Sequence, residues 1–116
     1  MRTVVAGAED SLKQYISQRA RGAYIASICR PDLSFAFAAA AQHSFPGPTE
    51  FKALNNALTT IIETPENGIR FVPQDPDTLR LAVFIDASFA NNSDLSSQLG
   101  IIVTLMDGEG TTNIVH

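Results

Sequence analysis

Apolar positions recur with a helical period in the first half of the chain and alternate with polar positions in the second. The helical spacing predicts three helices, over about residues 12–29, 33–44 and 50–63. The stripe of the first helix consists of Leu12, Ile16, Ala20, Ala23 and Ser27, widened by Tyr15, Tyr24 and Ile28. The third helix has the clearest amphipathic pattern, formed by Phe51, Leu54, Leu58, Ile61 and Ile62.

Capping residues predict where these helices begin and end. Ser11 is the expected N-cap of the first helix, and Gln14 three positions later completes a capping box. Pro31 disfavours helical backbone at the residue before it, so the first helix should end near residue 29. Asp32 and Thr49 are the expected N-caps of the second and third helices.

The second half of the chain predicts strands. A short extended piece is expected from Ile69 to Pro73, followed by an alternating strand from Leu79 to Phe89. Because both faces of that strand are largely apolar, we expect it to be buried and central. A β-branched run from Leu99 to Met106, a turn at residues 107–110 and a last strand at 111–115 form a hairpin. The predicted class is α+β, with three helices followed by a three-stranded antiparallel meander.

The composition fits a folded protein without a membrane span. The chain has 116 residues, of which 45% are hydrophobic and 17% charged, too apolar for a disordered segment. No apolar run reaches the ~20 residues that a bilayer requires. We expect a single compact unit over residues 1–116, with a helical part at 8–68 and a sheet part at 69–116. The single cysteine favours an intracellular location, in the cytoplasm or nucleus.

Charge is distributed unevenly along the chain. Residues 1–53 contain six basic and four acidic residues, and residues 54–116 contain two basic and eight acidic ones, so the two parts carry +2 and −6. Neither part is a polybasic patch, which predicts weak or no binding to nucleic acid. The isolated His43 and His116 are expected at the surface, and Cys29 is expected to be a small buried apolar residue rather than a nucleophile.

Four short motifs occur in order along the chain. Arg30–Ala36 is R-P-D-L-S-F-A, Pro48–Leu54 is P-T-E-F-K-A-L, Thr64–Ile69 is T-P-E-N-G-I, and Asp86–Ala90 is D-A-S-F-A. Together they resemble the polyproteins of copia-type LTR retrotransposons, where the end of the reverse transcriptase continues into a ribonuclease H domain. The resemblance implies that residues 8–68 are similar to thumb and connection helices. It implies that residues 69–116 are similar to the first strands of a ribonuclease H-like sheet.

The resemblance also implies a role for Asp86, as the first metal-binding carboxylate of a site for Mg²⁺ or Mn²⁺. Such a site hydrolyses an RNA–DNA hybrid with two ions held by roughly four carboxylates. The alternative is that Asp86 caps the loop after its strand. Ser88 replaces the second acid of the family motif, and the chain ends at His116 before the remaining family carboxylates. We therefore expect a truncated chain that is catalytically inactive by itself and has no cofactor, unless the ancestral activity is retained.

Basic residues are scarce where relatives in this family have them. The third helix has neutral or acidic residues in place of several lysines and arginines, namely Asn55, Asn56, Thr59, Thr60 and Glu63. Arg19, Arg21 and Arg30 are the remaining candidates for phosphate contact. For Arg19 and Arg21, an ordinary solvated helix face is the alternative.

Loss of these charges favours a second function, a co-opted interaction module. Such a module would self-associate or bind a protein partner through its sheet edge or an apolar helix face. Without the later strands of the family's sheet, one edge of the strand from Leu79 to Ile85 would be unpaired, and this run has no polar residue except Arg80. An unpaired apolar edge is a template for pairing, so we expect a homodimer that buries the sheet edge or the apolar helix faces between subunits. The alternative is a monomer in which the three helices cover the sheet.

Overall fold

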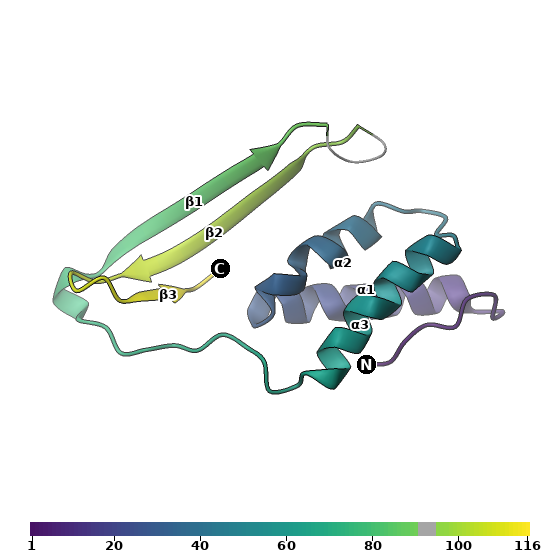
Figure 1. The fold of residues 1–116 in the computed structure, drawn as a ribbon, viewed down its shortest axis with the longest axis horizontal. Helices are drawn as coiled ribbons and strands as arrows, with labels where there is room; N and C mark the ends of the chain where they lie inside the picture. The colour runs from purple at the N-terminus through teal and green to yellow at the C-terminus, as the bar shows by residue number, and fades with distance from the viewer. Residues whose placement is uncertain (91–94) are drawn as a thin grey trace. The chain divides into compact units, whose positions relative to one another are not determined.

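The computed structural model describes residues 1–90 and 95–116, and these form an α+β protein as predicted. The chain divides into two compact units, Met1–Gly68 and Ile69–His116, at the expected border between its helical and sheet parts. Packing of both units into one compact body stays a prediction. The first unit contains α1 (Ser11–Ile28), the 3₁₀ helix η1 (Pro31–Leu33), α2 (Ser34–Ala41) and α3 (Pro48–Glu63). The second contains the 3₁₀ helix η2 (Pro76–Thr78), β1 (Arg80–Ser88), β2 (Gln98–Met106) and β3 (Thr112–Ile114) (Figure 1).

The first helix ends where the sequence predicts but has a different cap at its start. Its N-cap is Asp10, not Ser11, which is already helical. The Asp10 carboxylate accepts a hydrogen bond of 2.6 Å from the Gln14 side chain. Gln14 therefore contacts a residue four positions before it, whereas the predicted capping box paired it with Ser11, three positions before it. The last helical residue is Ile28, with Cys29 as C-cap. This agrees with the prediction, because Pro31 disfavours helical backbone at the residue before it.

The other two predicted caps are wrong. Asp32 lies inside η1, so α2 begins only at Ser34. The N-cap of α3 is Gly47, and Pro48 occupies the first helical position, which suits proline because its missing N–H would have no helical acceptor. The Glu50 carboxylate accepts a 2.8 Å hydrogen bond from the Gly47 N–H, and hydrogen bonds from backbone N–H groups lower the pKa of Glu50. The acidic residue of the first turn therefore stabilises this end of α3.

Helices α1, α2 and α3 enclose the hydrophobic core of the first unit. Its buried members are Val4, Tyr15, Ala26, Phe37, Ala40, Phe51, Leu54, Ala57 and Leu58. The rings of Tyr15 and Phe51 are 5.0 Å apart and tilted by 59°, a favourable edge-on geometry. The Tyr15 hydroxyl donates to the Ala40 carbonyl at 3.1 Å, and burial raises the pKa of Tyr15. Phe51, Leu54 and Leu58 of the predicted α3 stripe are buried in this core. Ile61 packs against it partly buried, whereas Ile62 is exposed, so the prediction is wrong for Ile62.

The predicted stripe of α1 is wrong, because the buried face of this helix has a different composition. Its buried residues are Tyr15, Gln18, Gly22 and Ala26, whereas Leu12 and Ile16 are exposed. A Cβ atom at Gly22 would lie only 2.0 Å from the Phe37 ring, so the absence of a side chain admits this aromatic ring against α1. Close approach of α2 therefore determines which face of α1 is covered.

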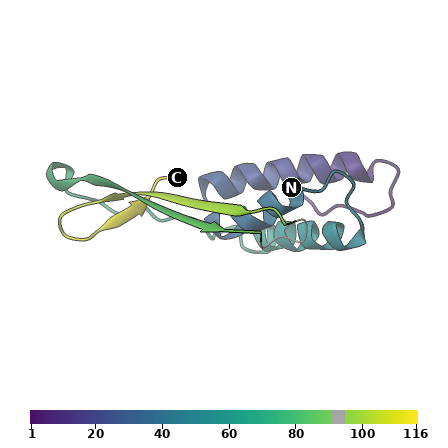
Figure 2. The same ribbon diagram turned by 90° about the horizontal axis from the view of Figure 1, so that it is seen from above.

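The strands form one antiparallel sheet in the order β1-β2-β3, which confirms the meander. The ladder between β1 and β2 is continuous from the pair Arg80 and Met106 to the pair Ser88 and Gln98. Figure 2 shows these two strands crossing as a twisted ribbon, as expected for a long hairpin. Strand β1 is at the edge of the sheet, so the expectation of a buried central strand is wrong for the described residues.

Candidate functional site

Asp86 is an exposed residue of β1, paired in the ladder with Gly100 of β2. A catalytic Mg²⁺ pair requires several converging oxygen ligands. Within residues 1–90 and 95–116, the structure contains no group of three or more acidic, histidine or cysteine residues that could hold a metal ion. The assignment of Asp86 as a metal ligand thus stays a prediction. Asp94, another acidic residue of this region, lies outside the described residues.

Asp107 has a structural role at the opposite end of the same hairpin. It follows Met106, the partner of Arg80, and so lies seven residues or about 23 Å along the hairpin from Asp86. Only 2% of its surface is exposed, and its carboxylate accepts hydrogen bonds from the backbone N–H groups of Asp75, Glu109 and Thr111. These bonds close the predicted turn between β2 and β3.

Two amide side chains attach the segment before β1 to the sheet. The Asn113 amide, which is buried in β3, accepts from the Val72 N–H at 2.9 Å and donates to the Val72 carbonyl at 2.8 Å. The Gln74 amide donates to the carbonyls of Leu105 and Thr111 at 2.8 and 2.7 Å. The expected extended piece at 69–73 is therefore present as irregular chain, because side chains rather than a backbone ladder hold it.

Arg30 is buried at the junction between the ends of α1 and α3. Its guanidinium forms two bonds to the Asp32 carboxylate, at 3.1 and 2.9 Å, and two further bonds to the carbonyl and hydroxyl of Thr64. The hydrogen bond from Arg30 lowers the pKa of Asp32. Only 4% of Arg30 is exposed, so this side chain connects two parts of the backbone instead of offering a free cation at the surface.

The three candidate arginines do not form one phosphate-binding group. Arg19 and Arg21 are two positions apart on α1, and residues at that spacing lie on different sides of a helix. Arg19 is half-buried and Arg21 is exposed, while Arg30 is occupied by Asp32 and Thr64. Contact of these residues with nucleic acid stays a prediction, but the geometry gives it no combined site.

The hairpin of β1 and β2 exposes many apolar side chains of the second unit. Residues that pair across the ladder share a face, and one face is aliphatic along its whole length. This aliphatic face consists of Leu81, Val83, Ile85 and Ala87 from β1 and Leu99, Ile101, Val103 and Leu105 from β2. Ile85 is 67% exposed and Leu99 is 64% exposed. The opposite face also exposes Phe84 and Ile102.

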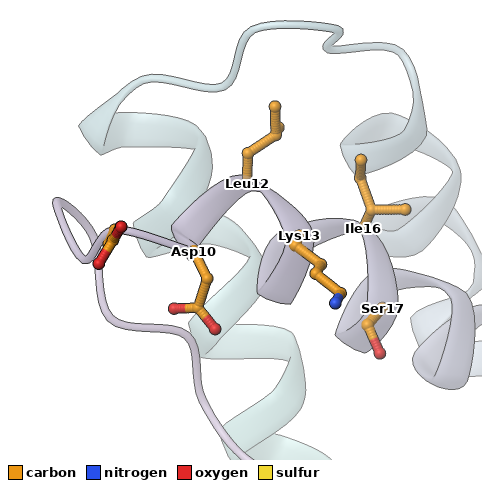
Figure 3. Close-up of a pocket in the computed structure, with 6 residues that line it drawn as sticks. Asp10, Leu12, Lys13, Ile16 and Ser17 are labelled. Atoms are coloured by element: carbon orange, nitrogen blue, oxygen red, sulfur yellow. The ribbon is translucent and has the colours of Figure 1, made fainter.

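An open pocket is present at the start of α1 (Figure 3). Its lining comes from the first turns of this helix and the loop before it, and consists of Glu9, Asp10, Leu12, Lys13, Ile16 and Ser17. The lining contains the Ser17 hydroxyl but no histidine.

The remaining candidate residues are located as follows. His43 and His116 are exposed, as predicted, and Cys29 is half-buried, with its thiol donating to the Ile25 carbonyl at 3.6 Å.

None of the helices that the structure describes has the length and hydropathy needed to cross a membrane. Comparison with models of protein families, with curated proteins and with solved structures gave no match. The copia-type resemblance therefore depends on the motifs alone.

Sequence reasoning missed the polar residues that hold each unit together. Asn55 was notable only as a position without positive charge, yet its amide accepts from the Val4 N–H at 2.7 Å and donates to the Val4 carbonyl at 2.8 Å. Asn113 makes the same paired contact in the sheet unit. The only sequence signal for either contact would have been a polar residue within an otherwise apolar element. For Asp107, the glycine-rich turn after it was an additional signal.

Proposed function

We propose that this chain is a protein–protein interaction module whose sheet accepts a further strand at the outer edge of β1. The observation that carries the proposal is the exposed edge position of β1, a nine-residue strand with five consecutive apolar residues from Leu81 to Ile85. Edge strands usually have features that prevent pairing, such as lysine, proline or a bulge. Strand β1 contains neither residue type, and its ladder with β2 is continuous. An edge of this kind suits recognition by strand addition.

The proposal includes descent from the reverse transcriptase and ribonuclease H region of a copia-type polyprotein. One contact supports it: Arg30 of the R-P-D motif binds Thr64 of the T-P-E-N-G-I motif, although 34 positions separate them. Two of the four motifs thus meet in one folded unit. An acidic residue on the first strand of an antiparallel meander is also compatible with this origin.

We further propose that the isolated chain does not hydrolyse an RNA–DNA hybrid. Among the described residues no group of three or more acidic, histidine or cysteine residues could hold a metal ion. Asp107 accepts hydrogen bonds from backbone N–H groups at the far end of the hairpin. The purified chain incubated with a hybrid and Mg²⁺ or Mn²⁺ should give no cleavage. Cleavage that disappears in Asp86→Asn would overturn this part of the proposal.

Photo-crosslinking tests the interaction function directly. Benzoylphenylalanine is placed at Ile85 on the edge strand, and for comparison at the exposed Ala20 on α1, in cells that express the chain. Covalent adducts are expected at position 85 and absent at position 20. Adding Val83→Pro should abolish the adducts at position 85, because proline removes an outward N–H without touching the ladder to β2. Equal yields at positions 85 and 20 would contradict the proposed function.

A further inference from the structure

The backbone of β1 presents alternate residues to its open edge. Val103 of β2 donates to the His116 carbonyl and accepts from the Val115 N–H, so its backbone groups point toward the β3 side. In an antiparallel ladder the direction alternates from residue to residue. Ile102 and Thr104 therefore face β1 and bond to Phe84 and Ala82, their register partners. It follows that Leu81, Val83 and Ile85 direct their N–H and C=O groups outward.

The side chains of β1 add a charge pattern to this edge. Its only charged residues are Arg80 and Asp86, near its two ends, and both are exposed. They are six positions apart, so they are on the same face of the sheet. A strand with a cation at its start and an anion near its end is complementary to itself in the antiparallel direction.

This inference rests on the proposed function and names the partner. We propose that the edge of β1 pairs with β1 of a second copy of this chain, antiparallel, about a two-fold axis at Val83. In this register Arg80 of each copy is opposite Asp86 of the other, and Leu81 is opposite Ile85. The two Val83 residues exchange backbone hydrogen bonds. Two three-stranded sheets then become one six-stranded sheet with a continuous aliphatic face.

The charges select this register over the neighbouring symmetric one. A two-fold axis at Phe84 would place Arg80 opposite Ser88 and Asp86 opposite Ala82, which leaves both charges without an opposite partner. Directly opposed charges of unlike sign stabilise a strand pair, and like charges destabilise it. With the axis at Val83, each dimer contains two pairs of opposite charge, and each pair joins Arg80 of one copy to Asp86 of the other.

Charge exchange on the full-length chain tests the pairing. Sedimentation at micromolar concentrations should show a dimer that weakens about tenfold in Arg80→Asp and about tenfold in Asp86→Arg, because each change sets like charges opposite one another. The double variant Arg80→Asp/Asp86→Arg should restore association to near the original strength. A lack of rescue in the double variant overturns the register. A mass of one copy throughout the concentration range overturns self-pairing.

Disulfide formation provides a second measurement that is independent of charge. In a Cys29→Ser background, Val83→Cys places two thiols on directly opposed residues, with Cα atoms about 5.5 Å apart, within disulfide range. Phe84→Cys is the matched control, because it would be self-opposed only in the alternative register. The expected result is a covalent dimer for Val83→Cys under mild oxidation and a much lower yield for Phe84→Cys. The reverse preference contradicts the Val83 axis.

These results separate the inference from the proposed function. A chain that is monomeric when purified but forms adducts at position 85 in cells, with proteins other than itself, overturns self-pairing and leaves the interaction function in place. A chain that forms neither a dimer nor adducts overturns both. Adducts at position 85 with twice the mass of the chain support both.

Discussion

The two units of this protein differ in which residues they bury. Among the described residues, all nine buried core hydrophobics are in the helical unit, Met1–Gly68. The buried residues of the sheet unit are Thr104, Asp107 and Asn113, all polar. The sheet unit also contains leucine, isoleucine, valine and phenylalanine residues, but its hairpin exposes many of them to solvent.

The two units are therefore stabilised by different kinds of interaction. The helical unit is stabilised by the removal of apolar side chains from water, at roughly 25 cal/mol per Å². The sheet unit is held by its backbone ladder and by amide and carboxylate contacts to Val72, Asp75 and the turn. Its hairpin exposes apolar side chains, and this exposure is the physical basis of the proposed function.

The largest contrast should come from deleting one aliphatic side chain in each unit. Leu58→Ala removes a fully buried side chain, and we expect a loss of about 3 kcal/mol in the free energy of unfolding of the helical unit. Ile85→Ala, at a side chain that is 67% exposed, should cost less than about 1 kcal/mol in the dilute chain. Urea unfolding followed by helical circular dichroism and by amide exchange measures both. Similar losses at the two positions would contradict the comparison.

The next effect tests whether the close approach of two helices determines the core. Gly22→Ala would gain about 1 kcal/mol from helix propensity alone, but the new methyl group would overlap the Phe37 ring. We expect the destabilising overlap to exceed the gain in helix propensity, so the free energy of unfolding measured in urea should fall by about 1–3 kcal/mol. Gly22→Ala should be much less harmful in a Phe37→Leu background. Stabilisation by Gly22→Ala alone would show that α1 and α2 are not packed at this point.

A smaller and local effect is expected in the sheet unit. Asp107→Ala removes the carboxylate acceptor of three partly buried hydrogen bonds from backbone N–H groups, at a cost of about 1–3 kcal/mol. Hydrogen exchange at Glu109 and Thr111 should accelerate while the helices keep their protection, because the two units have separate sources of order. Asp77→Ala, an exposed acid nearby, is the control and should leave these amides unchanged. Faster exchange throughout both units would show that their stabilities are coupled.

The smallest effect concerns the dependence of the helical unit on pH. The hydrogen bond from Arg30 lowers the pKa of Asp32, so ionised Asp32 stabilises the fold. This contribution is fully present at a pH above the ordinary carboxyl pKa of about 4. It is lost as the pH falls through the lowered pKa of Asp32. Asp32 is 57% exposed, so less than about 1 kcal/mol is expected. Wild type should lose more stability than Asp32→Asn on acidification below pH ~4. The control Glu66→Gln should behave like wild type.

How much could be predicted differs between elements for physical reasons. Most of the buried face of helix α3 was predicted, because Phe51, Leu54 and Leu58 recur at helical spacing. Helix α1 was predicted in extent but not in orientation, because Gly22 and Gln18 are not recognised as core residues without knowledge of the neighbouring Phe37. Caps were misplaced by one to two residues, since Asp10 and Gly47 serve as well as the residues beside them.

The candidate site shows the same division. Alternation from Leu79 to Phe89 predicted a strand, yet alternation says nothing about how many neighbours that strand has. Its edge position, and hence its outward N–H and C=O groups, follows only from the pairing in the sheet. Arg30 was a candidate for phosphate contact from its charge, whereas its bonds to Asp32 and Thr64 depend on two segments meeting in space.

The α+β class, the order of helices and strands and the turn after β2 could be predicted, because period and turn chemistry are local properties. The covered faces of the helices and the hydrogen-bond partners of the polar side chains could be found only in the folded chain. Burial and pairing depend on neighbours that are distant along the chain. For this protein the sheet leaves β1 at an exposed edge, the surface on which the proposed association depends.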